Sequence, residues 1–253
     1  MEIVDIIAKK QTKEGLFPTY RSKKEDLIIE SSESRVDNVG LHTFVLEKVL
    51  SLQSQKPEAK EIFQKGLDFL IQDAVNQDGR LTWRWLRHPL KDDWLYPPDA
   101  DDTARARTVI ELSKLNGFKV PLEFCDFDYT NFIEEGMTPI GGRLTFVGLK
   151  PDDSICPVVN ANLLYSYRLH LKSTGQDANK DKTHEKVKGY LEKVVKTNEF
   201  ASPDFARCSK FYLSHNLLGY LISEMQEVFG KDSLKIVRER IERENGSYEN
   251  PLE

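Results

Sequence analysis

Hydrophobic positions recur with the period of an α-helix along most of the chain, and two kinds of helix alternate. The first kind is apolar on most of its sides, which is typical of a buried helix. The second kind has one apolar stripe, as from Val187 through Leu191 to Val195, which is typical of a helix on the outside of a domain. The inner segments are 41–52, 103–116, 157–171 and 208–229, and the outer segments are 58–75, 184–196, 231–244 and a short one near 129–135.

The turns that follow the outer segments repeat as well. Each has a polar stretch, then a glycine, then a short run that ends in an aromatic residue. A positive φ at the glycine lets the chain fold the aromatic ring onto a neighbouring helix end. Gly15, Gly79 and Gly142 follow one another at intervals of 64 and 63 residues. The turns read KEGLFPTY at 13–20, QDGRLTWRW at 77–85, GGRLTFVG at 141–148 and ENGSY at 244–248, with a degenerate one near Ser202.

Alternating helix pairs joined by repeated turns predict an all-α protein, an α/α barrel in which inner helices line a cavity and outer helices shield them. We expect residues 1–253 to form a single domain of this kind. The pattern gives fewer inner helices than a closed ring needs. Three explanations stay open: the ring is incomplete, a helix is hidden in 16–36, or the natural chain continues beyond Glu253.

Composition narrows the function. The net charge is −5, and basic and acidic residues are interspersed, so no nucleic-acid footprint is expected. The sequence has no apolar run of about 18 residues and no signal-peptide pattern at its start, which predicts a cytoplasmic protein without a membrane span. Cys125, Cys156 and Cys208 lack metal-ligand spacing, and we interpret them as reduced thiols.

The most informative stretch, WLYPPDADDTA, runs from Trp94 to Ala104 at the start of an inner segment. It resembles the DxDD-T-A signature of class II terpene cyclases, above all squalene-hopene cyclases. The glycine-aromatic turns resemble that family's QW repeats, and Gln77 with Trp83 is the best instance. The resemblance implies a helical barrel over about 10–250 and the proton-initiated cyclisation of a linear isoprenoid.

By this resemblance Asp101 is the general acid, and Asp99 and Asp102 orient it by hydrogen bonds. Carboxyl groups that are packed together repel one another as anions, so at least one stays protonated. The carbocation then needs aromatic faces around it. We expect no cofactor, except Mg²⁺ for a diphosphate substrate, and no metal ligands. Candidate substrate-binding residues are Trp83, Trp85, Trp94, Tyr96, Phe146 and Tyr165, with Asn160 and Asn162 as polar contacts.

Helix capping is the alternative interpretation of the aspartates. An aspartate before a helix accepts a backbone N–H of the first turn. Other inner segments follow Asp37, Asp152 with Asp153, and Asp204. A cap needs one aspartate, however, and this stretch has three within four positions. Asn160 and Asn162 have a comparable alternative, in which they bond to neighbouring helices rather than to a ligand.

Three other functions are compatible with the barrel. Protein prenyltransferases bind zinc through Asp, Cys and His, and Asp153, Cys156 and His215 resemble this set with a different spacing. A sugar-acting enzyme would pair Asp101 with Asp153 or Glu224. The third is a non-catalytic module that binds an isoprenoid or a partner. Because hopene-type cyclases close their site between two barrels, a single barrel predicts self-association or a partner protein over the Asp101 end.

Overall fold

The computed structural model confirms an all-α protein with little sheet. None of the helices in the described part is long and apolar enough to cross a membrane. The chain divides into two compact units, Met1–Phe127 (unit 1) and Asp128–Glu253 (unit 2). The assignment of residues 1–253 to a single domain stays a prediction. The structure describes residues 3–20, 35–36, 38–53, 56–85, 98–145, 155–200, 205–209, 212, 215–232 and 234–246.

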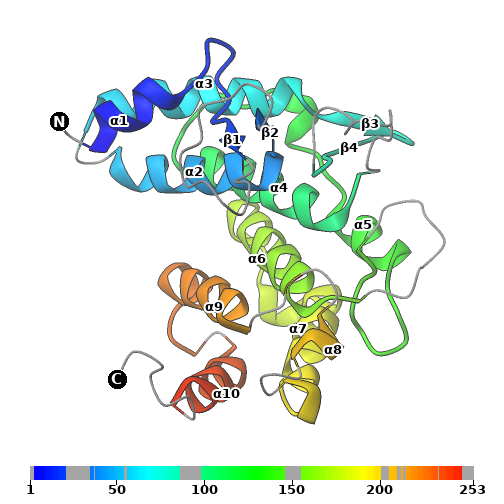
Figure 1. Cartoon of the computed structure of the whole chain (residues 1–253). Coiled ribbons are helices and arrows are strands. Elements are labelled where there is room, and N and C mark those ends of the chain that lie inside the picture. The colour runs from blue at the N-terminus through cyan, green and yellow to red at the C-terminus, as the bar shows by residue number, and fades with distance from the viewer. Residues whose placement is uncertain are drawn as a thin grey trace. The chain divides into compact units, whose positions relative to one another are not determined.

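Unit 1 is built on three mutually contacting helices, α2, α3 and α4 (Figure 1). Two antiparallel strand pairs accompany them, β1 with β2 and β3 with β4. Of the range 16–36, in which a hidden helix is one of the open explanations, 21–34 lie outside the described residues, and the described ends include β1 and β2. The elements are α1 (Ile3–Lys10), β1 (Thr19–Tyr20), β2 (Arg35–Val36), α2 (Val39–Leu52), α3 (Glu58–Gln72), β3 (Val75–Gln77), β4 (Arg80–Thr82), α4 (Ala100–Leu115) and η2 (Leu122–Phe124).

The two inner helices of unit 1, α2 and α4, run in the same direction. At their N-terminal ends, a Cβ added to Gly40 would lie 3.0 Å from an Oδ atom of Asp102. At their C-terminal ends, Nε2 of Gln53 donates to Oδ1 of Asn116 at 3.0 Å. The parallel arrangement predicted for inner helices is therefore present within this unit.

The outer helix α3 packs against α2 through a glycine. A Cβ on Gly66 would lie 2.4 Å from Cδ2 of Leu46, so a larger residue would require the Leu46 side chain to move. The buried ring of His42 bridges the two helices, because Nδ1 accepts the N–H of Phe17 at 3.2 Å and Nε2 faces the Gly66 carbonyl at 3.1 Å. The proton therefore sits on Nε2. Burial lowers the pKa of His42 to about 4, which keeps the ring neutral.

Unit 2 repeats this plan around α6, which contacts the outer helix α7 and the inner helix α9 (Figure 1). Sγ of Cys156 lies 3.3 Å from Oγ of Ser209 before the two inner helices begin. The ring of Phe229, at the end of α9, lies 4.5 Å from the guanidinium of Arg168 on α6, so these helices are parallel too. The elements are α5 (Tyr129–Glu135), α6 (Pro157–Ser173), η3 (Ala178–Lys180), α7 (Lys182–Val194), η4 (Asn198–Phe200), α8 (Phe205–Cys208), α9 (His215–Phe229) and α10 (Lys235–Gly246).

The predicted continuous helix over 208–229 is wrong. Helix α8 ends at Cys208, and α9 begins at His215. Between them, the hydroxyl of Ser209 accepts the backbone N–H of Tyr212 at 3.2 Å. Serine side chains compete in this way with the helical hydrogen bonds of the main chain. The interruption therefore has a local cause that the apolar pattern does not reveal.

Two turn glycines have the same role in the two units. Gly15 has φ 107°, and a Cβ there would lie 2.2 Å from the carbonyl oxygen of Lys65 on α3. Gly141 has φ 95°, and a Cβ would lie 2.9 Å from the carbonyl oxygen of Lys186 on α7. The positive-φ residue of the third turn is therefore Gly141, not Gly142 as the sequence suggested.

The second turn is built differently. Asp78 and Gly79 have φ 52° and 83° and form the tip of the β3–β4 hairpin. Two successive positive φ values are typical of a type I′ turn, whose twist suits a hairpin. A Cβ on Gly79 would meet nothing within 4 Å. Gly79 is therefore needed for the backbone conformation of the turn and not for a close approach to a helix.

Three turns share a hydrogen bond that the sequence did not suggest. In each case a backbone N–H of the turn segment donates to the side chain of the fourth residue of an inner helix. This bond attaches the turn segment to the first helical turn of the inner helix. It also gives a partner to two buried polar groups, the backbone N–H and the side-chain acceptor. The pairs are Phe17 with His42 at 3.2 Å, Trp83 with Thr103 at 3.1 Å and Arg143 with Asn160 at 2.8 Å.

The shared bond can be tested at Thr103. Thr103→Val keeps the shape of the side chain but leaves the buried N–H of Trp83 without its acceptor, which should lower the free energy of unfolding by about 1–3 kcal/mol. Thr103→Ser retains the hydroxyl and serves as the control. Urea denaturation measures both variants. Equal stability of the valine and serine variants would show that the bond contributes nothing.

The turn glycines allow a matched comparison. Gly117 has φ 72° with nothing within 4 Å of an added Cβ, so Gly117→Ala reports the backbone strain alone. That strain costs about 1–2 kcal/mol. Gly15→Ala should destabilise unit 1 by more, because its Cβ also collides with the Lys65 carbonyl. Thermal melts of the two variants would refute the packing role of Gly15 if their midpoints fell by the same amount.

Candidate functional site

Asp99 caps helix α4. Its backbone is extended, with φ −132° and ψ 167°, and its Oδ1 accepts the backbone N–H of Asp102 at 2.8 Å. The helix therefore begins at Ala100, three residues earlier than the predicted start at Thr103. The capping interpretation is confirmed for Asp99, and Asp101 and Asp102 lie in the first turn of the helix.

The side chains of Asp99 and Asp102 are buried and hydrogen-bonded to each other. Two carboxylates cannot share a hydrogen bond unless one of them holds a proton. Burial, together with the charge of Asp101, raises the pKa of Asp99 to about 7. Burial first, and then the charges of Asp99 and Asp101, raise the pKa of Asp102 well above its usual range. This pair therefore retains a proton near neutral pH.

Asp101, the predicted acid, is half-buried and is the least enclosed of the three. Its negative charge raises the pKa of both neighbours, so the three carboxyl groups form one electrostatic unit. We call Asp99, Asp101 and Asp102 the aspartate cluster. The cluster can hold a proton in its buried pair and present a carboxyl group at Asp101 to a ligand.

A buried ion pair lies beside the aspartate cluster. Nη2 of Arg105, one turn further along α4, is 2.7 Å from Oε1 of Glu47 on α2, and both side chains are less than a tenth exposed. The positive charge of Arg105 acts on Asp102 in the direction opposite to burial and lowers its pKa. Sequence reasoning missed both residues, because nothing in their spacing links position 47 to position 105.

Trp83 is a core residue of unit 1. Its side chain is 0% exposed, and its indole N–H donates to the carbonyl of Leu70 at 2.9 Å. The ring contacts Phe124 and the guanidinium of Arg107. The contacts that the described residues make with this ring are core contacts, and the binding role of Trp83 stays a prediction. Trp85, by contrast, is 43% exposed.

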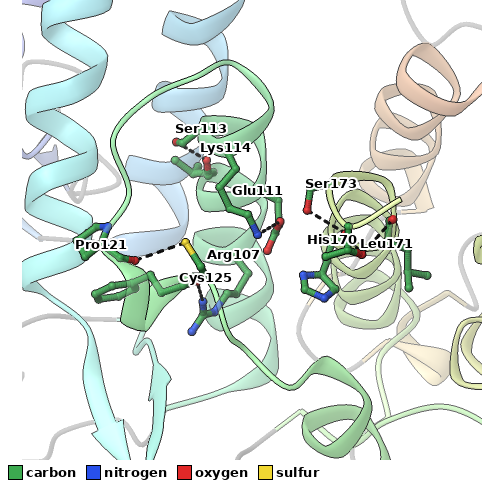
Figure 2. A network of polar contacts seen from close by, with 12 residues as sticks. Arg107, Glu111, Ser113, Lys114, Pro121, Cys125, His170, Leu171 and Ser173 are labelled. Atoms are coloured by element: carbon green, nitrogen blue, oxygen red, sulfur yellow. Dashed lines mark hydrogen bonds and ion pairs between the residues drawn. The ribbon is translucent and has the colours of Figure 1, made fainter. Parts of the chain in front are cut away.

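Helix α4 is buried almost all round although its sequence is rich in polar residues. Arg107 donates to the carbonyls of Phe124 at 2.8 Å and Leu81 at 3.1 Å, and its guanidinium lies 3.9 Å from the ring centroid of Phe127. Figure 2 shows the hydrogen bond from Arg107 to the Phe124 carbonyl beside the contact from the Cys125 thiol to the Pro121 carbonyl. These contacts hold the segment after α4 in place and give Arg107 a structural role.

The predicted polar contacts of unit 2 are also core residues. Asn160 is 0% exposed; its amide nitrogen donates to the carbonyls of Arg143 and Cys156 at 3.0 Å. Asn162 is buried, and Tyr165 is buried with its ring edge-on to Phe229. For Asn160, intramolecular bonding is thus the interpretation that the structure supports, with a turn segment as the partner rather than a helix.

Four of the candidate residues lie outside the described residues: Trp94, Tyr96, Phe146 and Asp153. Of the three suggested zinc ligands, only the Cys156 side chain is described, and its thiol contacts Ser209. Within the described ranges no group of three or more His, Cys, Asp or Glu side chains is arranged to hold a metal. The Glu224 side chain is half-buried on α9 of unit 2.

Comparison with protein-family models, curated proteins and solved structures finds no match. Function is therefore inferred from the geometry of the site. The aspartate cluster is the part of the predicted site that the structure brings together. Its chemical capacity is to hold, and to release, a proton near neutral pH.

The protonation of the buried pair predicts a dependence of stability on pH. The pKa of Asp99 is about 7 in the folded chain and 3.8 without the fold, so the folded chain binds more protons between these values. The free energy of unfolding therefore falls as pH rises through this window, and Asp102 adds a contribution of the same sign. Asp102→Asn removes that contribution, because asparagine is neutral in both states. The variant should gain stability relative to wild type as pH rises.

Denaturation of wild type and Asp102→Asn across this pH range measures the difference. His42 acts with the opposite sign, since its pKa is lowered from 6.5 to about 4, but it is common to both proteins and cancels. Asp126→Asn, at an exposed position, is the control and should follow wild type. A difference between Asp102→Asn and wild type that does not change with pH would contradict the shared proton.

Proposed function

We propose that this chain acts as a class II terpene cyclase-like protein that protonates and cyclises a linear isoprenoid through the aspartate cluster. The observation that supports this proposal is the buried Asp99–Asp102 pair, which retains a proton near neutral pH. Alkenes are very weak bases, so their protonation needs a carboxylic acid that is still protonated under working conditions. Such perturbed carboxyl groups are concentrated at functional sites.

Each aspartate has its own role in this proposal. Asp101, the least enclosed member of the cluster, takes the proton from the buried pair and passes it to the alkene, which leaves the cluster with one more negative charge until the carbocation returns a proton. Asp102 and Asp99 share a proton and so keep the number of negative charges beside Asp101 low. Asp99 also caps α4 and fixes the position of the first turn. The reaction needs no cofactor, and only a diphosphate substrate would require Mg²⁺.

An α/α barrel built from both units is part of the proposal. It is supported by the parallel inner helices within each unit and by the turn glycines that pack on α3 and α7. A second barrel, as a partner or another copy, would cover the Asp101 end. Leu41, which is 51% exposed in the first turn of α2, and Trp85 offer apolar area there; the Trp85 carbonyl accepts the N–H of Val39.

A non-catalytic isoprenoid-binding or partner-binding module is the second candidate. The burial of the Trp83 and Tyr165 rings in the cores of their units favours it, because these two rings then offer no aromatic face to a carbocation. Asp99 would in that case serve only as a cap. The two candidates differ in whether a product is formed, not in whether a ligand binds.

The test is a paired assay of wild type and Asp101→Asn with linear isoprenoids of several lengths. Asparagine keeps the shape of the side chain but has no proton acidic enough for an alkene. Turnover should fall by at least about 10²–10⁴-fold, the usual contribution of a general acid. The melting temperature should stay close to that of wild type, because the cap is Asp99.

Cyclised product from Asp101→Asn at the wild-type rate would overturn the assignment of Asp101. If neither protein forms product, while an isoprenoid raises the melting temperature of both, the binding module replaces the cyclase. Asp177→Asn, a substitution at an exposed cap in unit 2, controls for the loss of a carboxylate as such.

A further inference from the structure

Arg105 has an unexpected partner. It lies three residues after Asp102 and four after Asp101, at spacings where side chains are neighbours on a helix surface. An arginine at such a position ordinarily pairs with an aspartate one turn earlier. Here its ion pair is made with Glu47, on a different helix, with 2.7 Å between Nη2 and Oε1. Within the described residues this is the one ion pair of Arg105.

Because the ion pair of Arg105 and Glu47 is buried, the identity of the anion that Arg105 binds has a large energetic effect. Both side chains are less than a tenth exposed, so neither charge is well screened by water. A guanidinium stays protonated in proteins and cannot relieve its burial by becoming neutral. Without Glu47, Arg105 would need another anion, and the carboxyl groups within one turn of it on α4 are Asp101 and Asp102.

The described charged residues near the aspartate cluster offer Arg105 few other partners. Asp102 lies against the first turn of α2, where Gly40 admits its Oδ1. Lys48, the other charged residue in this part of α2, lies 5.5 Å from the ring centroid of Phe44. The charged residues that α2 and the start of α4 contribute are Glu47 and Lys48 on α2, and the cap Asp99 with Asp101, Asp102 and Arg105 on α4.

We propose that Glu47 is a positioning residue: by binding Arg105 it keeps the guanidinium away from Asp101 and Asp102, and the aspartate cluster therefore retains its shared proton. The role of this proton in catalysis rests on the proposed cyclase function. Retention of the proton does not, because it is a property of the unliganded protein. Burial and mutual repulsion raise the pKa of Asp102, and Arg105 already opposes this from its present position.

The test is a titration of the aspartate carboxyl groups by NMR in protein labelled with ¹³C at the aspartate carboxyl. Loss of the signal in Asp102→Asn identifies the resonance of Asp102. Glu47→Gln keeps the shape of the side chain and removes its charge, which frees Arg105. The titration midpoint of Asp102 should then fall by about one pH unit or more, as expected when an opposite charge comes close.

The double variant Glu47→Gln with Arg105→Gln separates positioning from a merely structural role. Both members of the buried pair are then neutral, so the midpoint should return to the wild-type value or rise above it. A structural role would instead leave both variants with a wild-type midpoint and lowered stability. An unchanged midpoint in folded Glu47→Gln, or a midpoint in the double variant below that of wild type, would overturn the proposal.

The titration can be interpreted even if Glu47→Gln fails to fold or wild type forms no product. If Glu47→Gln fails to fold, the double variant, which removes both charges of this buried pair, still gives the second comparison. If wild type forms no cyclised product, the titration nevertheless decides the role of Glu47. If wild type forms product and the midpoint does not move, the inference about Glu47 fails while the proposed function stands.

Discussion

The fold depends on finding partners for polar groups that the inner helices carry into the core. A buried donor or acceptor without a partner costs about 1–3 kcal/mol, more when charged. The inner helices meet this constraint at their fourth residue, where His42, Thr103 and Asn160 each accept a backbone N–H from a turn. The same bonds hold the turn segments in place, so satisfying the polar groups also sets the connections between helices.

The aspartate cluster arises from the same constraint. A cap is needed where α4 begins, and Asp99 provides it. Asp102 is then buried against α2 and loses its hydrogen bonds to water. A proton shared with Asp99 compensates for this loss. The positive charge of Arg105, one turn further along α4, is paired with Glu47. A structural requirement thus brings together carboxyl groups whose pKa values are raised.

The sequence predicted the alternation of inner and outer helices because apolar periodicity depends only on which side is buried. It could not show that 208–229 is interrupted, because the hydrogen bond from the N–H of Tyr212 to the hydroxyl of Ser209 leaves no trace in the apolar pattern. Gly141 and Gly142 are adjacent, so the sequence could not show that Gly141 is the one that approaches the Lys186 carbonyl. The aspartate cluster was predictable from its spacing. Which carboxyl is buried was not, because burial of Asp102 depends on Gly40 of another helix.

The central claim is that a carboxyl group of the cluster is protonated at neutral pH. Infrared spectroscopy of protein labelled with ¹³C-aspartate tests it most directly, because protonated and ionised carboxyl groups absorb at separate frequencies. At pH 7 wild type should show a protonated carboxyl band that is lost in the variant Asp99→Asn with Asp102→Asn. A wild-type spectrum with ionised aspartates alone would contradict the account.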